Sequence, residues 1–91
     1  MSALNQQFLK DLEQYWHCEV RDASSGVDLL KALSHPGHLI NAEEFQECLE
    51  SAIEQRNINV TDYQSVTGLD LETADQVAED LRGLRRMMHG T

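Results

Sequence analysis

Hydrophobic residues recur at helical spacing along most of this 91-residue chain. In residues 3–16 they lie three and four positions apart, which places them on one face of a helix. These positions are Leu4, Phe8, Leu9, Leu12, Tyr15 and Trp16. Cys18 and Val20 then alternate with polar residues, as in a short strand, but Val20 also continues the row of Leu12 and Trp16. We therefore expect a helix that frays by Arg21.

A second helix is predicted over residues 26–34. Ser25 followed by Asp28 resembles a capping box, with Asp in place of the usual Glu or Gln. Its buried face would consist of Val27, Leu30 and Leu33. The helix should end before Pro36, because proline disfavours helical backbone in the residue before it.

The segment that begins at Asn41 has the clearest helical signals. Asn41 and Glu44 have the spacing of a capping box, and Ile40 and Phe45 occupy the hydrophobic staple positions on either side of it. The buried row would be Phe45, Leu49, Ala52 and Ile53.

The opposite side of this third helix carries an acidic stripe. Its members lie at i, i+4, i+7 and i+11, and they are Glu43, Glu47, Glu50 and Glu54. Arg56 follows at the C-terminal end, where the helix dipole favours a cation. Such a stripe is usually a solvated face, but it also offers a partner a row of negative charge.

Two further helices are predicted after residue 60. Thr61 and Gln64 form another capping box for a short helix over residues 62–67, and Gly68 can adopt the positive φ that ends it. Asp70 would cap a last helix that stays apolar on one face to about residue 88. That face consists of Leu71, Ala74, Val77, Ala78, Leu81, Leu84 and Met88. The sequence thus predicts an all-α fold, a compact bundle of about five helices forming one domain over residues 1–91.

The charge of the chain is strongly one-sided. Sixteen acidic residues stand against seven basic ones, which gives a formal net charge of −9. Such a charge repels nucleic acid and anionic membranes and steers the protein toward basic partners. The N-terminus has no secretory pattern, and no apolar run is long enough for a membrane helix, so we expect a cytoplasmic protein with reduced thiols.

Residues 60–81 resemble the helix-turn-helix of winged-helix and repressor families. The matching residues are Tyr63 on the first helix, Gly68 and Leu69 at the turn, and Ala74 and Val77 on the second helix. Residues 30–36 are also similar to the opening of small metalloregulatory winged-helix repressors, although no β-hairpin pattern follows residue 81 to form a wing.

This resemblance implies a second helix that enters the major groove of DNA. Its groove-facing residues would be Leu71, Glu72, Asp75, Gln76 and Glu79. Three of them are acidic and none is basic, whereas binding to DNA depends on Lys and Arg. A short turn between two helices is also a common packing arrangement without any link to DNA.

The sequence contains no convincing catalytic, metal or cofactor site. His35 and His38 are separated by Pro-Gly, and no Cys-x-x-Cys completes a zinc pattern. His17 adjoins Cys18, but neighbours on a helix do not face each other. The Asp-Ser-Leu of acyl carrier proteins is absent. We therefore expect no enzyme, no metal and no cofactor.

The pattern favours a small acidic protein-binding module, such as an inhibitor, adaptor, immunity-type protein or chaperone-like regulator, acting on a basic protein surface. The alternative is a DNA-binding transcriptional regulator that uses the cluster Arg82, Arg85 and Arg86. Long apolar faces on the first and last helices leave homodimer formation open. The residues predicted to contact the partner are Glu43, Glu47, Glu50, Glu54, Glu72, Asp75, Glu79, Asp80, Trp16 and Tyr63. The two aromatic residues, with Tyr15, could equally belong to the core.

Overall fold

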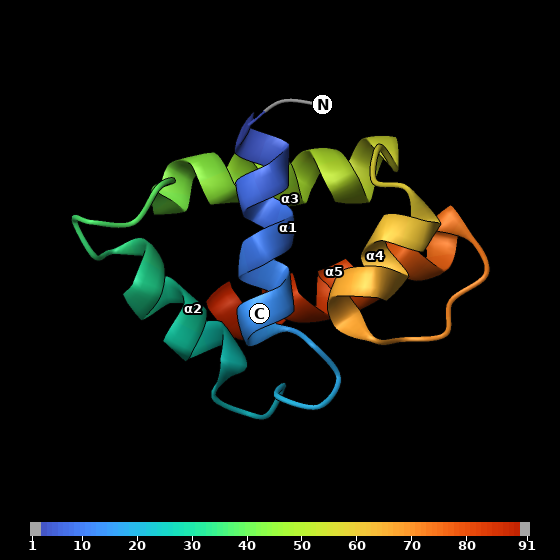
Figure 1. Ribbon diagram of the computed structural model, residues 1–91, viewed down its shortest axis with the longest axis horizontal. Helices are drawn as coiled ribbons and strands as arrows, with labels where there is room; N and C mark the ends of the chain where they lie inside the picture. Colours follow the sequence, from blue (N-terminus) through green and yellow to red (C-terminus); the bar gives the residue numbers. More distant parts are fainter. Residues whose placement is uncertain (1–2, 90–91) are drawn as a thin grey trace.

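The computed structural model describes residues 3–89, and within this range it contains five α-helices and no strand. Helix α1 crosses in front of α3, with α2 and α4 on opposite sides of it and α5 behind (Figure 1). Their bounds are α1 (Ala3–Tyr15), α2 (Ser25–Leu33), α3 (Ala42–Gln55), α4 (Val60–Thr67) and α5 (Ala74–His89). The predicted all-α bundle of about five helices is therefore confirmed.

One apolar core joins side chains from all five helices. The rings of Phe8 on α1 and Phe45 on α3 pack at a centroid distance of 4.8 Å. The predicted buried row of α3 and the α5 residues from Val77 to Met88 on the predicted face are buried. Of the predicted α1 face, Phe8, Leu12 and Trp16 are buried, while the side chain of Leu4 lies outside those described.

The expectation that the first helix continues toward Arg21 is wrong. Helix α1 ends at Tyr15, and the next residues form turns. The Trp16 backbone N–H still donates to the Leu12 carbonyl at 2.7 Å, but the Arg21 side chain then donates to the Trp16 carbonyl at 3.0 Å. This second bond takes the carbonyl that a continuing helix would have used, so the chain turns away.

The predicted buried face of α2 is shifted by tertiary packing. Val27 is half exposed, and Leu29 is buried in its place, together with the predicted Leu33. Gly26 explains the shift, because a Cβ at this position would lie 2.6 Å from the backbone carbonyl carbon of Met87 on α5. Helix α2 therefore approaches α5 most closely through Gly26, which turns Val27 toward solvent.

Two helix boundaries match their local signals. Asn41 and Glu44 form the predicted capping box, with the Glu44 N–H donating to Asn41 Oδ1 at 2.8 Å and the Asn41 N–H donating to Glu44 Oε1 at 3.1 Å. Gly68 ends α4 with φ of 72°, as predicted. These contacts fix where α3 begins and where α4 ends.

Three predicted caps are wrong. The Ser25 hydroxyl accepts from the Asp22 N–H at 2.7 Å instead of capping α2. Helix α4 is capped by Asn59, which lies before Thr61, and Thr73 replaces Asp70 as the cap of α5. For α4 and α5 another side chain reaches the free N–H groups, whereas Ser24 at the N-cap of α2 makes no side-chain cap hydrogen bond.

The later start of α5 leaves residues 68–73 between α4 and α5. This connection is longer than the turn of about three to four residues in a helix-turn-helix. Leu71 and Glu72, predicted on the groove-facing side of the second helix, lie in the connection. No helix within residues 3–89 combines the length and the apolar character that crossing a bilayer requires.

Candidate functional site

The outer face of α3 presents three glutamates to solvent. Glu43, Glu47 and Glu54 are exposed, and within residues 3–89 no ion pair joins them to a basic side chain. The capping box at Asn41 sets the start of α3 and therefore the direction in which these side chains point. We call these three residues the α3 carboxylate face.

Glu50, the fourth member of the predicted stripe, is bound within the molecule. Its carboxylate accepts hydrogen bonds from Arg85 at 3.0 and 3.2 Å and from Gln46 at 3.0 Å. Arg85 lies on α5, so this ion pair ties α3 to α5. The predicted acidic stripe is thus neutralised at one position and keeps its charge at the other three.

Unlike the α3 carboxylate face, most of the acidic residues predicted as contacts around the start of α5 are in ion pairs. Asp75 pairs with Arg56 at 2.7 Å, Glu79 pairs with Arg82, and Asp80 pairs with Arg21. Of the four predicted contact residues here, Glu72 alone has no ion pair within residues 3–89. Two of the arginines come from other parts of the chain, so the sequence pattern of α5 gave no sign of them.

Asp80 is the centre of a polar cluster that joins the α1–α2 connection, α4 and α5. Its carboxylate accepts from Trp16 Nε1 at 3.0 Å, from the Tyr63 hydroxyl at 2.5 Å and from the Arg21 guanidinium at 2.8 and 3.1 Å. The Arg21 guanidinium also lies 3.8 Å from the centre of the Trp16 ring, at cation–π distance. The four side chains satisfy one another, which explains how Asp80 tolerates partial burial.

The electrostatics of this cluster follow from the same contacts. Burial alone would raise the pKa of Asp80, but the hydrogen bonds and charge of Arg21 and the hydroxyl of Tyr63 hold that pKa below its ordinary value. Burial, followed by the Asp80 charge, raises the pKa of the Tyr63 hydroxyl well above its ordinary value. Asp80 is therefore ionised and Tyr63 protonated at neutral pH.

Trp16 and Tyr63 are core residues and are not exposed to a partner. Both are buried, and the polar atom of each is bound to Asp80. Their prediction as contact residues is therefore wrong for the folded chain, and the alternative that they belong to the core is confirmed. Tyr15 is partly buried and packs against the core.

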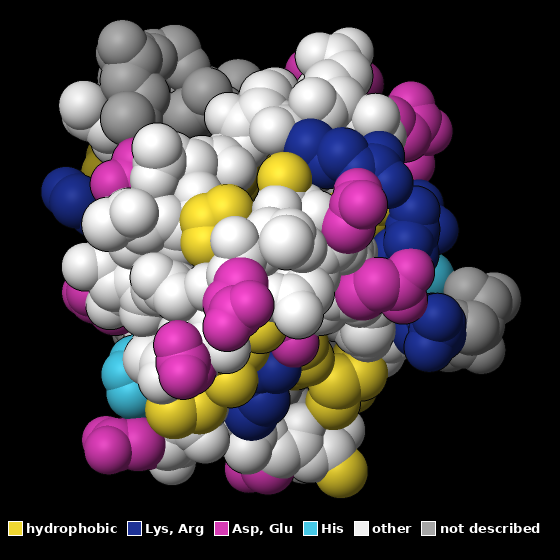
Figure 2. Space-filling view, turned by 90° about the vertical axis from the view of Figure 1, so that its right-hand side faces the viewer, with side chains coloured by type: hydrophobic (Ala, Val, Ile, Leu, Met, Phe, Trp, Pro, Cys, Tyr) yellow, Lys and Arg dark blue, Asp and Glu magenta, His cyan; other side chains and the backbone are white. Residues whose placement is uncertain are grey.

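Basic side chains lie beside acidic ones along one side of the face shown in Figure 2. Arg56, Arg82 and Arg85 are all in ion pairs with carboxylates. Arg86 is exposed on the last turns of α5. The arginines that a DNA-binding surface would need are thus largely engaged within the molecule.

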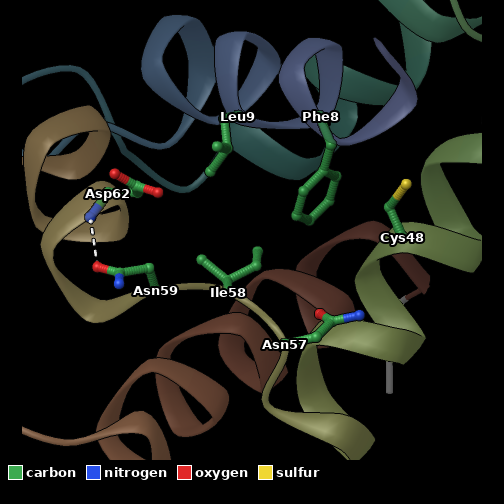
Figure 3. A pocket seen from close by; sticks show the side chains of 7 residues that line it. All are labelled: Phe8, Leu9, Cys48, Asn57, Ile58, Asn59 and Asp62. Atoms are coloured by element: carbon green, nitrogen blue, oxygen red, sulfur yellow. Dashed lines mark hydrogen bonds between the residues drawn. The ribbon is translucent and has the colours of Figure 1, made fainter. Parts of the chain in front are cut away.

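A small pocket opens between α1 and the α3–α4 connection. Its volume is about 100 Å³, with Phe8 and Leu9 above it and Ile58 below it (Figure 3). Cys48 contributes from α3, and Asn57, Asn59 and Asp62 complete the lining. The sequence pattern does not predict this pocket, because its lining comes from α1, α3, the α3–α4 connection and α4, which meet only in the folded chain.

The histidines and cysteines form no metal site within residues 3–89, where no group of three potential ligands converges. His38 Nε2 lies 3.1 Å from the carboxylate of the buried Asp11. Neither cysteine forms a disulfide within residues 3–89, and Cys18 is exposed whereas Cys48 is buried. Burial, with the charges of Glu47 and Glu44, raises the pKa of the Cys48 thiol.

No model of a known protein family matches the chain, and no curated protein or solved structure is significantly similar to it. The resemblance of residues 60–81 to a helix-turn-helix therefore stays a prediction. The function of the chain has to be argued from its own residues, and the α3 carboxylate face and the neighbouring pocket are its most distinctive features.

Proposed function

We propose that the chain is a small non-enzymatic binding module that recognises a basic surface on another protein. The α3 carboxylate face is the observation that carries this proposal. Four other carboxylates are matched by arginines of the same molecule, whereas Glu43, Glu47 and Glu54 are exposed on one face of α3 and carry no such match within residues 3–89. Exposed charge of one sign speeds association with an oppositely charged surface and selects against wrong partners.

Charge reversal of this face tests the proposal. The variant E43K/E47K/E54K should lose a partner that the wild-type chain captures from its native host, because lysines repel a basic surface. The matched control E13K/E19K/D70K changes the net charge equally at three exposed positions away from α3 and should retain that partner. Quantitative mass spectrometry of the captured proteins gives the result, and circular dichroism checks that both variants fold.

Equal capture by the two variants would show that the α3 carboxylate face is only a solvated surface. Binding of duplex DNA that weakens steeply with salt would instead favour the DNA-binding alternative, because phosphate contacts release counterions. A mobility-shift titration of the wild-type chain over a range of salt concentrations distinguishes these readings.

A further inference from the structure

A binding surface made of charge alone would associate quickly but hold its partner weakly. Affinity in protein interfaces is concentrated in a few desolvated contacts, which are usually apolar or aromatic side chains seated in pockets. The two aromatic residues that could have served as anchors, Trp16 and Tyr63, are buried in the core. Among the described residues, the exposed large hydrophobic side chains are the aliphatic Val20, Val27 and Leu39, so an anchor supplied by the partner and seated in a pocket of this chain is the arrangement to consider.

We propose that the pocket between Phe8, Leu9, Cys48 and Ile58 receives an apolar side chain of the basic partner. This inference rests on the proposed function and names the contact that would give it affinity. Phe8 and Leu9 point down from α1, and Ile58 points up toward them from the α3–α4 connection (Figure 3). The occupant thus meets apolar side chains on two sides.

The size of the pocket limits its occupant. Its volume of about 100 Å³ is somewhat below that of an engineered cavity of about 150 Å³ that holds benzene. A side chain such as leucine or methionine has suitable dimensions, whereas an indole is too large. Phe8 forms part of the buried core, so a side chain seated here would extend that core toward the partner.

The charges around the pocket specify the residues that flank the anchor. Glu47 and Glu44 are close enough to raise the pKa of the Cys48 thiol, and Asp62 lies on the rim. Glu47 belongs to the α3 carboxylate face and directly precedes Cys48, a lining residue of the pocket, on α3. Lysines or arginines next to the apolar anchor would meet these carboxylates.

The neutral polar residues at the rim fit the backbone of such a segment. The Asn59 side-chain oxygen accepts from the backbone N–H groups of Thr61 and Asp62 at 2.8 and 3.3 Å, so it is fixed at the start of α4. Asn57 and Asn59 both line the pocket. The apolar pocket, the nearby carboxylates and the polar rim together fit an extended basic peptide with one central apolar residue.

Two synthetic peptides test the proposal against the full chain. Capped Lys-Lys-Leu-Lys-Lys should bind roughly tenfold more tightly than capped Lys-Lys-Ala-Lys-Lys, because the leucine buries additional carbon atoms. Titration of the ¹⁵N-labelled protein by NMR gives both dissociation constants. The leucine peptide should shift the amides of Phe8, Leu9 and Ile58, and the alanine peptide should leave them nearly unchanged.

Variants separate the pocket from the charged face. I58N should abolish the preference for leucine over alanine without changing the affinity for the alanine peptide, and I58V should keep the preference. L9Q provides a second polar variant in case I58N does not fold. The variant E43K/E47K/E54K should weaken the binding of both peptides and preserve their ratio.

The outcomes separate the two proposals. If neither peptide binds, the proposed recognition of a basic surface fails. If both bind equally and the pocket amides stay still, the pocket proposal fails and the charged surface stands. Amide shifts at Phe8 and Ile58 that grow with protein concentration alone would show that a second copy of the chain occupies the pocket, which also overturns the proposal.

Discussion

At the scale of single residues, the Asp80 carboxylate has the widest influence on the fold. It lies on α5, yet it accepts hydrogen bonds from Trp16, which is 64 positions away, from Arg21 and from Tyr63 on α4. These contacts hold the end of α1 against α4 and α5. The same cluster places Arg21 at the Trp16 carbonyl, which is where α1 stops.

Replacing Asp80 by Asn should destabilise the protein by about 2–4 kcal/mol. An amide has a single acceptor oxygen, so its NH₂ group would face either the Arg21 guanidinium or the N–H and O–H donors of Trp16 and Tyr63. Urea unfolding at neutral pH measures the loss. A loss below about 1 kcal/mol would mean that these donors find water or other acceptors.

The pKa of Asp80 gives this variant a characteristic pH dependence. Because that pKa is lowered in the fold, the wild-type advantage should be complete above the ordinary carboxyl value of 3.8 and should shrink as the pH falls below it. Comparing wild type with D80N at each pH cancels the titration of the other carboxylates. A difference in unfolding free energy that stays constant on acidification would show that the charge of Asp80 does not stabilise the fold.

At the scale of helices, replacing glycine by alanine should change stability in opposite directions at two positions with different surroundings. G26A should destabilise the protein by about 1–3 kcal/mol, because its Cβ would meet the Met87 backbone and force α2 away from α5. G83A should stabilise it by about 0.5–1 kcal/mol, because Gly83 lies inside α5 and a Cβ there would meet no atom of the described chain within 4 Å. Thermal unfolding of the two variants provides the comparison. Equal effects would contradict a close approach of α2 to α5 at Gly26.

The fold was predictable from sequence wherever local signals and tertiary packing agree. Helix α3 combines a capping box at Asn41 with a clear apolar row, and both appear in the structure. The end of α1 depends on Arg21, which binds both the Trp16 carbonyl and Asp80 on α5, and the buried face of α2 depends on the close approach of Gly26 to α5. Periodicity carries no information about such distant contacts, so these two features could not be predicted.

The candidate site was predictable to a similar extent. The spacing of Glu43, Glu47 and Glu54 is sufficient to place them on one exposed face, as the structure shows. The neutralisation of Asp75 by Arg56 and the pocket at Ile58 require knowledge of which segments meet. The charged surface can therefore be predicted from the sequence, whereas the pocket cannot.

At the scale of the whole molecule, most positive charge is used internally. Four of the seven basic residues, all arginines, form ion pairs with carboxylates, and the net charge is −9. Within residues 3–89 no arginine pairs with the remaining carboxylates, of which Asp11 lies beside His38, and the exposed ones repel one another. This repulsion lowers the free energy of unfolding. Stability of the fold therefore does not explain why carboxylates are concentrated on one helix face.

Neutralising one member of the α3 carboxylate face should therefore raise stability. Glu47 lies at i+4 from Glu43 and at i−7 from Glu54, and like charges at i,i+4 destabilise a helix by a few tenths of a kcal/mol. E47Q should raise the unfolding free energy by that amount and weaken binding of the basic peptides, which is the trade-off expected of a functional surface. E13Q is the matched control on α1, where Lys10 lies three positions away, and it should leave stability unchanged or slightly lower. A loss of stability in E47Q would indicate that Glu47 has a structural role in the fold. That role would explain the carboxylate without any binding partner.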